Sequence, residues 1–301
     1  MSIRLSLFNV WLRLMEKPFI ASSTDPIRHR KRLEWQAKNG FRPVPGVSCH
    51  DHMLGPVEAL TATPPRPVLP LDARILYLHG GGYNVGSRTT HQKLACAIAR
   101  VTGWPVTLPE YRLAPEHPFP AAIDDAQACY GAMFEDDTRP VVVMGESAGG
   151  GLSLALLHAI CAGDLPKPLA VVALSPWADL SNSSESFIRN EHRDVVLAPA
   201  AMHRTAESYL GGAEATHPLA SPVFGDFAGA PPVLIQVSAR EILEDDAHRV
   251  AARLTECGVD VSLQTWDNTP HAWHLFHGLF PEADAALEDI RAFLAKISPC
   301  R

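Results

Sequence analysis

Blocks of apolar residues alternate with blocks of mixed polarity along most of the chain. Six short, largely apolar runs predict strands: Arg74–His79, Pro105–Pro109, Pro140–Met144, Leu169–Leu174, Val233–Ser238 and Val259–Trp266. Longer segments with helical spacing of apolar residues predict helices: Thr90–Val101, Ala121–Phe134, Ser147–Ala162, Ile242–Cys257 and Glu282–Ile297. This alternation is typical of a mostly parallel sheet with helices on both faces. We therefore predict an α/β fold whose functional site lies at the carboxyl ends of the strands.

Two stretches do not follow this alternation. Residues 1 to about 42 look helical, and residues 181–212 form a polar, partly helical insertion between two predicted strands. The proline-rich segment 62–70 is typical of a loop between strands, so we expect no domain boundary there. The chain is thus expected to be one domain, residues 1–301, with a cap over the site formed by about 1–42 and 181–212.

Composition and charge narrow the possible partners. Hydrophobic residues make up 47% of the chain, enough for a large core. With 26 basic and 33 acidic residues the formal net charge is −7, which disfavours a nucleic-acid partner.

The location follows from three features. No apolar run reaches the length of a membrane-spanning helix, so we expect no stable membrane insertion. The N-terminus faintly resembles a signal peptide, but Asn9 and Arg13 interrupt its apolar run, which favours a short amphipathic helix. The six cysteines contain no CxxC pair and indicate free thiols. Together these features predict a cytoplasmic protein.

The most informative motif is Gly145-Glu146-Ser147-Ala148-Gly149, which follows a predicted strand and opens a predicted helix. Its small residues permit a sharp turn that holds the serine in a strained conformation with an exposed hydroxyl. The alternative is a glycine-rich helix start that only binds an anion. A phosphate-binding loop, however, would carry a Lys-Ser or Lys-Thr pair, which is missing here. We therefore predict that Ser147 is a nucleophile.

A second glycine-rich motif, His79-Gly80-Gly81-Gly82, directly follows the strand predicted over Arg74–His79. A plain turn would need only one glycine. Three in succession let backbone N–H groups approach a substrate oxygen, as in an oxyanion hole. His79 is expected to hold this loop and not to take part in the chemistry.

A nucleophilic serine also needs a base and a carboxylate that orients it. His271 follows the last predicted strand and is the candidate base. His271, His274 and His277 could suggest a metal site, but their spacing moves the third ring off the face of the first, and no carboxylate motif accompanies them. We expect no metal.

Two carboxylates compete for the orienting role. Glu241 lies three residues past the strand Val233–Ser238, whereas Asp245 is expected in the first turn of the next helix, where acidic residues are common. Glu241 is therefore the first choice and Asp245 the second. The order serine, acid, histidine is that of α/β-hydrolases.

These motifs resemble those of the hormone-sensitive-lipase-like esterases, the bacterial family IV branch of the α/β-hydrolase fold. The resemblance runs from about residue 72 to the C-terminus and covers five motifs in the same order: His79–Gly82, Tyr111–Glu116, Gly145–Gly150, Ser175–Asp179 and Pro270-His271.

The resemblance implies an eight-stranded sheet with one antiparallel strand near its start, which Val47–Thr63 could supply, and a helical cap. It also implies that the backbone N–H groups of Gly81, Gly82 and Ala148 form the oxyanion hole. Tyr111–Glu116 is interpreted as a brace for the oxyanion loop.

The chain departs from the family's pattern at two positions. Most members place Asp where Glu241 stands, and the longer side chain must retract by one methylene. Glu146 stands where Asp or Thr is common, which we interpret as the mark of a subgroup that leaves the chemistry unchanged.

The resulting prediction is a serine carboxylesterase that cleaves short-to-medium-chain esters through an acyl-serine intermediate, without a cofactor. Its expected partner is a small-molecule ester, and the edge strand Val259–Trp266 could pair two chains into a homodimer. Three alternatives stay open: a lactone hydrolase, an amidase or deacetylase, and a non-catalytic ligand-binding protein on the same fold.

Overall fold

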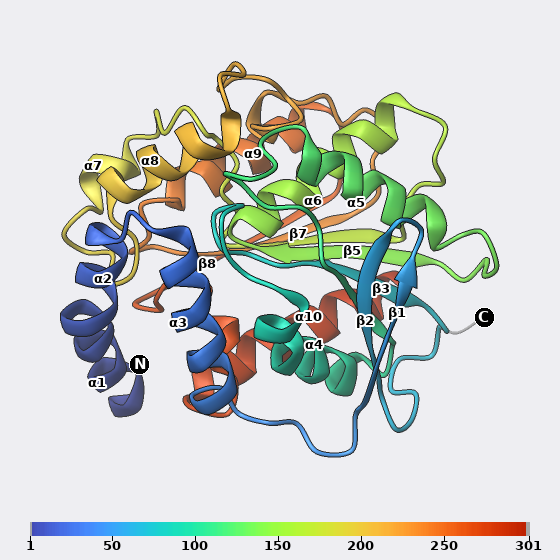
Figure 1. Cartoon of the computed structure of the whole chain (residues 1–301). Helices are drawn as coiled ribbons and strands as arrows, with labels where there is room; N and C mark the ends of the chain where they lie inside the picture. Colours follow the sequence, from blue (N-terminus) through green and yellow to red (C-terminus); the bar gives the residue numbers. More distant parts are fainter. Residues whose placement is uncertain (1, 299–301) are drawn as a thin grey trace.

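The short apolar runs of the sequence assemble into one sheet. The structure is a computed structural model, and it describes residues 2–298. The sheet has eight strands: β1 Ser48–Leu54, β2 Val57–Thr63, β3 Arg74–Leu78, β4 Val106–Pro109, β5 Val141–Glu146, β6 Ala170–Leu174, β7 Val233–Ser238 and β8 Val261–Trp266. They are arranged in the order β1-β2-β4-β3-β5-β6-β7-β8 (Figure 1). The predicted α/β fold with a mostly parallel, eight-stranded sheet is confirmed.

The antiparallel part of the sheet differs from expectation. Strands β4, β3, β5, β6, β7 and β8 run parallel to one another, whereas β2 runs antiparallel to both β1 and β4. The segment expected to supply one antiparallel strand thus forms a two-stranded hairpin. Gly55 makes the tight turn possible, because its φ of 58° lies in the left-handed region that favours glycine.

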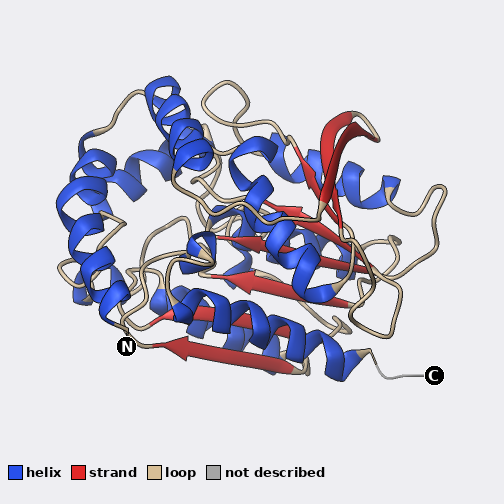
Figure 2. Ribbon diagram, turned by 90° about the horizontal axis from the view of Figure 1, so that it is seen from below, coloured by secondary structure: helices blue, strands red, loops and turns tan. Residues whose placement is uncertain are grey.

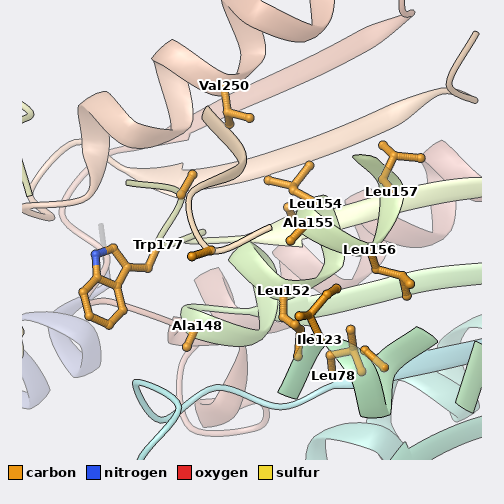
Figure 3. Close-up of a cluster of buried hydrophobic side chains, with 14 of the residues drawn as sticks. Leu78, Ile123, Ala148, Leu152, Leu154, Ala155, Leu156, Leu157, Trp177 and Val250 are labelled. Carbon is orange, nitrogen blue, oxygen red and sulfur yellow. The ribbon is translucent and has the colours of Figure 1, made fainter. Parts of the chain in front are cut away.

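Helices cover both faces of the sheet. Figure 1 shows α5 Ala121–Ala132, α6 Ala148–Ala162 and α9 Glu244–Glu256 on one face, with α4 Arg88–Thr102 and α10 Pro281–Ile297 on the other. Each face encloses its own cluster of buried apolar side chains. Side chains from β3, α5, α6 and α9 meet in the first of these clusters, among them Leu78, Ile123, Leu152 and Val250 (Figure 3). Helix α6 lies at the centre of this cluster, which fixes the position of the residue just before it, Ser147.

The segments outside the alternating pattern lie beyond the carboxyl ends of the strands. The N-terminal segment forms α1 Ile3–Trp11, the π-helical turn Leu12–Glu16, α2 Lys17–Ser22 and α3 Pro26–Asn39, and the insertion carries α7 Ser186–Arg189 and α8 Pro199–Leu210. In Figure 2 the strand arrowheads point toward the side of the molecule that holds these helices and the N-terminus.

The two segments also contact each other, since the Arg204 guanidinium of α8 donates a hydrogen bond to the Ala21 carbonyl of α2 at 2.7 Å. Two short 3-10 helices, Pro222–Phe224 and Trp273–Phe276, complete the secondary structure of the described residues. Over residues 2–298, none of the helices combines the length and apolar character needed to span a bilayer.

Candidate active site

Ser147 occupies the turn between β5 and α6, in the conformation that its motif predicts. Its backbone has φ 57° and ψ −123°, a sparsely populated region for a residue with a Cβ. Two backbone bonds hold it there: its N–H donates to the Leu174 carbonyl at 2.9 Å, and its carbonyl accepts from the Trp177 N–H at 2.9 Å. At Gly149 a Cβ atom would lie 2.0 Å from the Leu78 carbonyl oxygen, so only glycine fits this turn.

The structure brings together three side chains that the sequence separates widely. His271 Nε2 lies 2.8 Å from Ser147 Oγ, and His271 Nδ1 lies 2.5 Å from Glu241 Oε2. All three residues follow the carboxyl ends of strands: Ser147 after β5, Glu241 after β7 and His271 after β8. All three are also nearly buried, which strengthens the interactions among them.

The Glu241 carboxylate is held by neighbours in addition to the histidine. Its Oε1 accepts hydrogen bonds from Ser175 Oγ at 2.7 Å and from the Ser238 backbone N–H at 2.9 Å. Asp245, the second candidate, points elsewhere: its carboxylate accepts from the Ser186 N–H and pairs with the Arg189 guanidinium. Of the two carboxylates, Glu241 is therefore the one in contact with the histidine.

The charge of Glu241 affects the histidine. Burial by itself would lower the pKa of His271, but the adjacent Glu241 carboxylate and its hydrogen bond raise that pKa above 6.5. The carboxylate thus favours the protonated imidazole, the state that forms when the ring accepts a proton.

The glycine loop after β3 lies beside the serine. Gly81 and Gly82 both have left-handed φ angles, and a Cβ at Gly81 would lie 2.2 Å from the Val85 carbonyl oxygen. Within residues 2–298, no protein group accepts a hydrogen bond from the backbone N–H of Gly81, Gly82 or Ala148. Gly81 and Gly82 line the same cavity as Ser147 and His271. These N–H groups are therefore free to bind an oxygen of a ligand.

The expected brace of this loop is present. The Tyr111 hydroxyl donates to the His79 carbonyl at 2.6 Å, and the Ala114 N–H donates to the Tyr83 carbonyl at 2.9 Å. The His79 ring stacks on Tyr111, and its Nδ1 lies 2.8 Å from the Gly80 carbonyl. Burial lowers the pKa of His79 to about 3. His79 therefore stays neutral and supports the loop.

Glu146, one residue before the serine, also contacts the loop. Its buried carboxylate accepts from the Gly80 backbone N–H and the Tyr77 hydroxyl, both at 2.5 Å, and lies 2.8 Å from His91 Nε2. Burial by itself would raise its pKa, but His91 and these hydrogen bonds lower it, so the carboxylate stays charged. The sequence interpretation of Glu146 as only a subgroup marker overlooked this connection between the serine turn and the glycine loop.

The cavity above the serine has a volume of about 730 Å³. Its floor includes Ser147, His271 and the glycine loop, and its walls come from the N-terminal helices, the insertion that carries α8 and the segment after β8. Most of the wall side chains are apolar: Phe8, Trp11, Leu12, Met15, Ile20, Leu33, Trp35, Phe41, Val196, Leu197, Met202, Leu275, Phe276 and Leu279. An apolar cavity with a few convergent polar groups is typical of a small-molecule site.

The other histidines near the site have separate partners. His274 Nε2 lies 2.7 Å from Gln236 Oε1, and His277 Nε2 lies 3.1 Å from the Arg42 carbonyl. Among residues 2–298 no group of three or more histidine, cysteine or acidic side chains could hold a metal ion.

The family of this chain is evident from its similarity to known proteins. Residues 75–275 match a family described by the alpha/beta hydrolase fold. The chain belongs to this family. Two curated relatives are an acetyl-hydrolase of Streptomyces hygroscopicus and an ethyl acetate hydrolase of Pseudomonas putida. The first is 42% identical and covers 73% of this chain and 74% of its own. The second is 31% identical and covers 71% and 70%.

Solved structures extend the likeness to nearly the whole chain. An esterase/lipase from an uncultured bacterium superposes with a TM-score of 0.92 at 33% identity, covering 99% of each chain. An esterase from the bacterial hormone-sensitive lipase family gives 0.92 at 34% identity and the same coverage. The resemblance to hormone-sensitive-lipase-like esterases is thus confirmed. This hydrolase is an esterase of the serine hydrolase fold.

Two residues near Ser147, His271 and Glu241 carried no clear signal in the sequence. Ser175 belongs to a matched motif, yet nothing in that motif indicates its hydrogen bond to Glu241. Asp194 lies in the insertion, 47 residues before Glu241, and its buried carboxylate accepts from the N–H groups of Ile242 at 3.0 Å and Leu197 at 2.9 Å. It therefore connects the insertion to the loop that carries Glu241.

Proposed function

We propose that Ser147, His271 and Glu241 form the catalytic triad of an esterase that hydrolyses short-to-medium-chain carboxylic esters. The observation that carries this proposal is the chain of two short contacts from Glu241 through His271 to Ser147. In this proposal Ser147 is the nucleophile, His271 the general base, and Glu241 the carboxylate that orients the imidazole.

The mechanism follows from the same geometry. His271 Nε2 takes the proton of Ser147 Oγ as that oxygen attacks the ester carbonyl. The free N–H groups of Gly81, Gly82 and Ala148 stabilise the negative oxygen of the tetrahedral intermediate. His271 then gives its proton to the departing alcohol, and water attacks the acyl-serine to release the acid.

The substrate class is supported by the cavity. Its apolar walls favour an acyl or alcohol group without charge, and its volume is that of a small-molecule site. The names of the acetyl-hydrolase and ethyl acetate hydrolase relatives support short acyl groups in particular.

The nucleophile is tested with Ser147→Ala. The variant should lose p-nitrophenyl acetate hydrolysis by about 10⁶-fold in kcat, because no other group replaces the attacking oxygen. Circular dichroism and thermal unfolding serve as the control for folding. Near-normal turnover by a folded variant would remove Ser147 from the mechanism.

The substrate range is tested with a series of p-nitrophenyl esters from about two to about sixteen carbons, extended to lactones. We expect the highest kcat/KM among the short and medium chains. A maximum at the longest chain would contradict the proposed range. A preference for lactones over all linear esters would replace it with the lactonase alternative.

The homodimer and the cytoplasmic location are predictions from the sequence. Strand β8 lies at the edge of the sheet, where a second chain could add to it, and light scattering after gel filtration measures whether a homodimer forms. The cytoplasmic location stays a prediction from the sequence.

A further inference from the structure

The first helix of the chain and the π-helical turn after it expose a row of apolar side chains. Ile3, Leu7, Val10 and Leu14 follow one another at helical spacing and are 80%, 68%, 56% and 67% exposed. The opposite face buries the apolar Leu5 and Leu12 together with the polar Asn9 and Glu16. A surface helix normally turns its apolar stripe toward the core. Among residues 2–298, eight of the twelve large hydrophobic side chains that are exposed lie between residues 3 and 35, so they form a localised surface.

This apolar surface borders the cavity of the proposed active site. Trp11, Met15 and Trp35 are all exposed, and all three also line the cavity that contains Ser147 and His271. Trp11 and Met15 come from α1 and the turn after it, whereas Trp35 comes from α3. Apolar side chains of α1, of the turn after it and of α3 therefore border the mouth of the cavity.

The N-terminal segment, residues 1–42, has a net charge opposite in sign to that of the remaining chain. Residues 1–42 contain nine basic and three acidic residues, a net charge of +6. The remaining residues contain 17 basic and 30 acidic ones, a net charge of −13. Arg4, Arg13, Arg28, Lys31 and Lys38 of the N-terminal segment have exposed side chains. The overall acidity of the chain thus conceals a basic surface beside the cavity mouth.

We propose that this surface, the exposed face of α1–α3 with its apolar and basic side chains, docks the protein onto an anionic lipid surface. Helices with exposed apolar and basic residues lie in the plane of the lipid interface and need no membrane-spanning length. Negative headgroups attract the basic residues, and the apolar side chains enter the boundary with the acyl chains. Docking would place the cavity mouth against the lipid, so apolar esters could enter without crossing water.

A second copy of the chain fits this surface less well. A symmetric dimer pairs identical patches, which would place two segments of net charge +6 against each other. Anionic lipid offers the opposite charge. Charge complementarity therefore favours the lipid surface as the occupant.

The test is vesicle flotation with phosphatidylcholine vesicles that contain or lack phosphatidylglycerol. The protein should bind the anionic vesicles and dissociate at high salt. Leu7→Ser/Leu14→Ser should weaken binding by about tenfold or more, because it removes apolar area that enters the interface. Arg4→Gln/Lys31→Gln should weaken it by about 25-fold at low salt, at about fivefold for each charge.

Matched controls separate docking from general effects. Ile188→Ser and Lys296→Gln change an exposed apolar and an exposed basic residue outside the N-terminal segment, and both should bind as the unmodified protein does. Leu7 and Leu14 do not line the cavity, so their variant should keep its activity on the water-soluble ester p-nitrophenyl acetate.

Three results would overturn the proposal: equal binding to vesicles without phosphatidylglycerol, unchanged binding of the Leu7→Ser/Leu14→Ser variant, or a dimer in light scattering that this variant dissociates. The last would assign the surface to a second copy. Because flotation measures binding without turnover, its outcome is independent of the roles proposed for the triad.

Discussion

At the scale of single residues, the proposed orienting acid is a glutamate that follows β7. Glu241 reaches His271 with one carboxylate oxygen and is fixed through the other by Ser175 and Ser238. The extra methylene relative to aspartate is accommodated because these two donors hold the carboxylate in place. Asp245 is bound to Arg189 instead.

Glu241→Gln should therefore reduce kcat by about 10³–10⁴-fold, because the imidazole loses the charge that stabilises its protonated form. Asp245→Asn removes one side of a partly exposed ion pair and should change kcat by less than about tenfold. Steady-state kinetics on p-nitrophenyl butyrate compares the two variants. A larger loss in Asp245→Asn would move the orienting role to that residue.

The titration of His271 gives a second prediction at this scale. As the proposed base, His271 must be neutral, and the Glu241 carboxylate raises its pKa above 6.5 although burial opposes the shift. kcat/KM should consequently fall as the pH is lowered through this raised pKa. A profile from about pH 5 to about pH 9 measures the acidic limb. In Glu241→Gln the limb should move to lower pH, and a limb that stays in place would show that Glu241 does not set the pKa.

At the scale of elements, the serine turn and the glycine loop after β3 are joined through one buried carboxylate. Glu146 ends β5, and its hydrogen bonds reach Tyr77 in β3, Gly80 in the loop and His91 in α4. Since Ser147 and Ala148 follow Glu146 directly, we expect the spacing between the proposed nucleophile and the proposed oxyanion donors to depend on this carboxylate.

Glu146→Gln keeps the shape of the side chain but removes its charge and one acceptor. We expect kcat to fall by about tenfold or more, with a smaller change in KM, because the N–H groups would be less well aligned with the developing oxyanion. The exposed Glu135→Gln serves as a control. A change confined to KM would instead assign Glu146 to substrate binding.

At the scale of the whole molecule, the N-terminal helices are attached to the body by side chains that bind backbone carbonyls. Arg30 of α3 donates to the Asn84 carbonyl at 2.8 Å and the Ala114 carbonyl at 3.0 Å, and it pairs with Glu116 at 2.7 Å. Asn84 lies two residues after Gly82, the last residue of the glycine loop. One side chain thus connects the cavity wall to the oxyanion loop and its brace.

Arg30→Ala should lower the free energy of unfolding by about 1–3 kcal/mol, because two carbonyls and one carboxylate lose a charged donor. It should also raise KM for the preferred ester several-fold, since α3 forms part of the cavity wall. Thermal unfolding and steady-state kinetics measure both effects. The neighbouring exposed Lys31→Ala should change neither, and an Arg30→Ala variant with unchanged KM would separate α3 from substrate binding.

The local pattern of the sequence was sufficient to predict most of the strands and helices of this molecule. Strand, turn and helix follow from periods of two and 3.6 residues within a single segment, so the elements around Ser147 could be predicted from neighbouring residues. The order of the motifs likewise indicated the strand ends that carry His271 and Glu241. One segment differed from its prediction. Val47–Thr63 was expected to supply one antiparallel strand but forms two, because Gly55 permits a hairpin turn.

Only the tertiary structure decided which side chains meet across distant segments. The contact between Ser147 and His271 spans 124 residues, and the contact between Ser2 and Glu282 spans 280. The choice between Glu241 and Asp245, the hydrogen bonds of Glu146, the position of Asp194 and the outward face of α1 all depend on such contacts. A sequence pattern shows that a helix has an apolar stripe, but which face the body covers depends on packing against residues far along the chain. For α1 and the π-helical turn after it, packing buries Leu5 and Leu12 with Asn9 and Glu16, whereas it leaves Leu7 and Leu14 exposed.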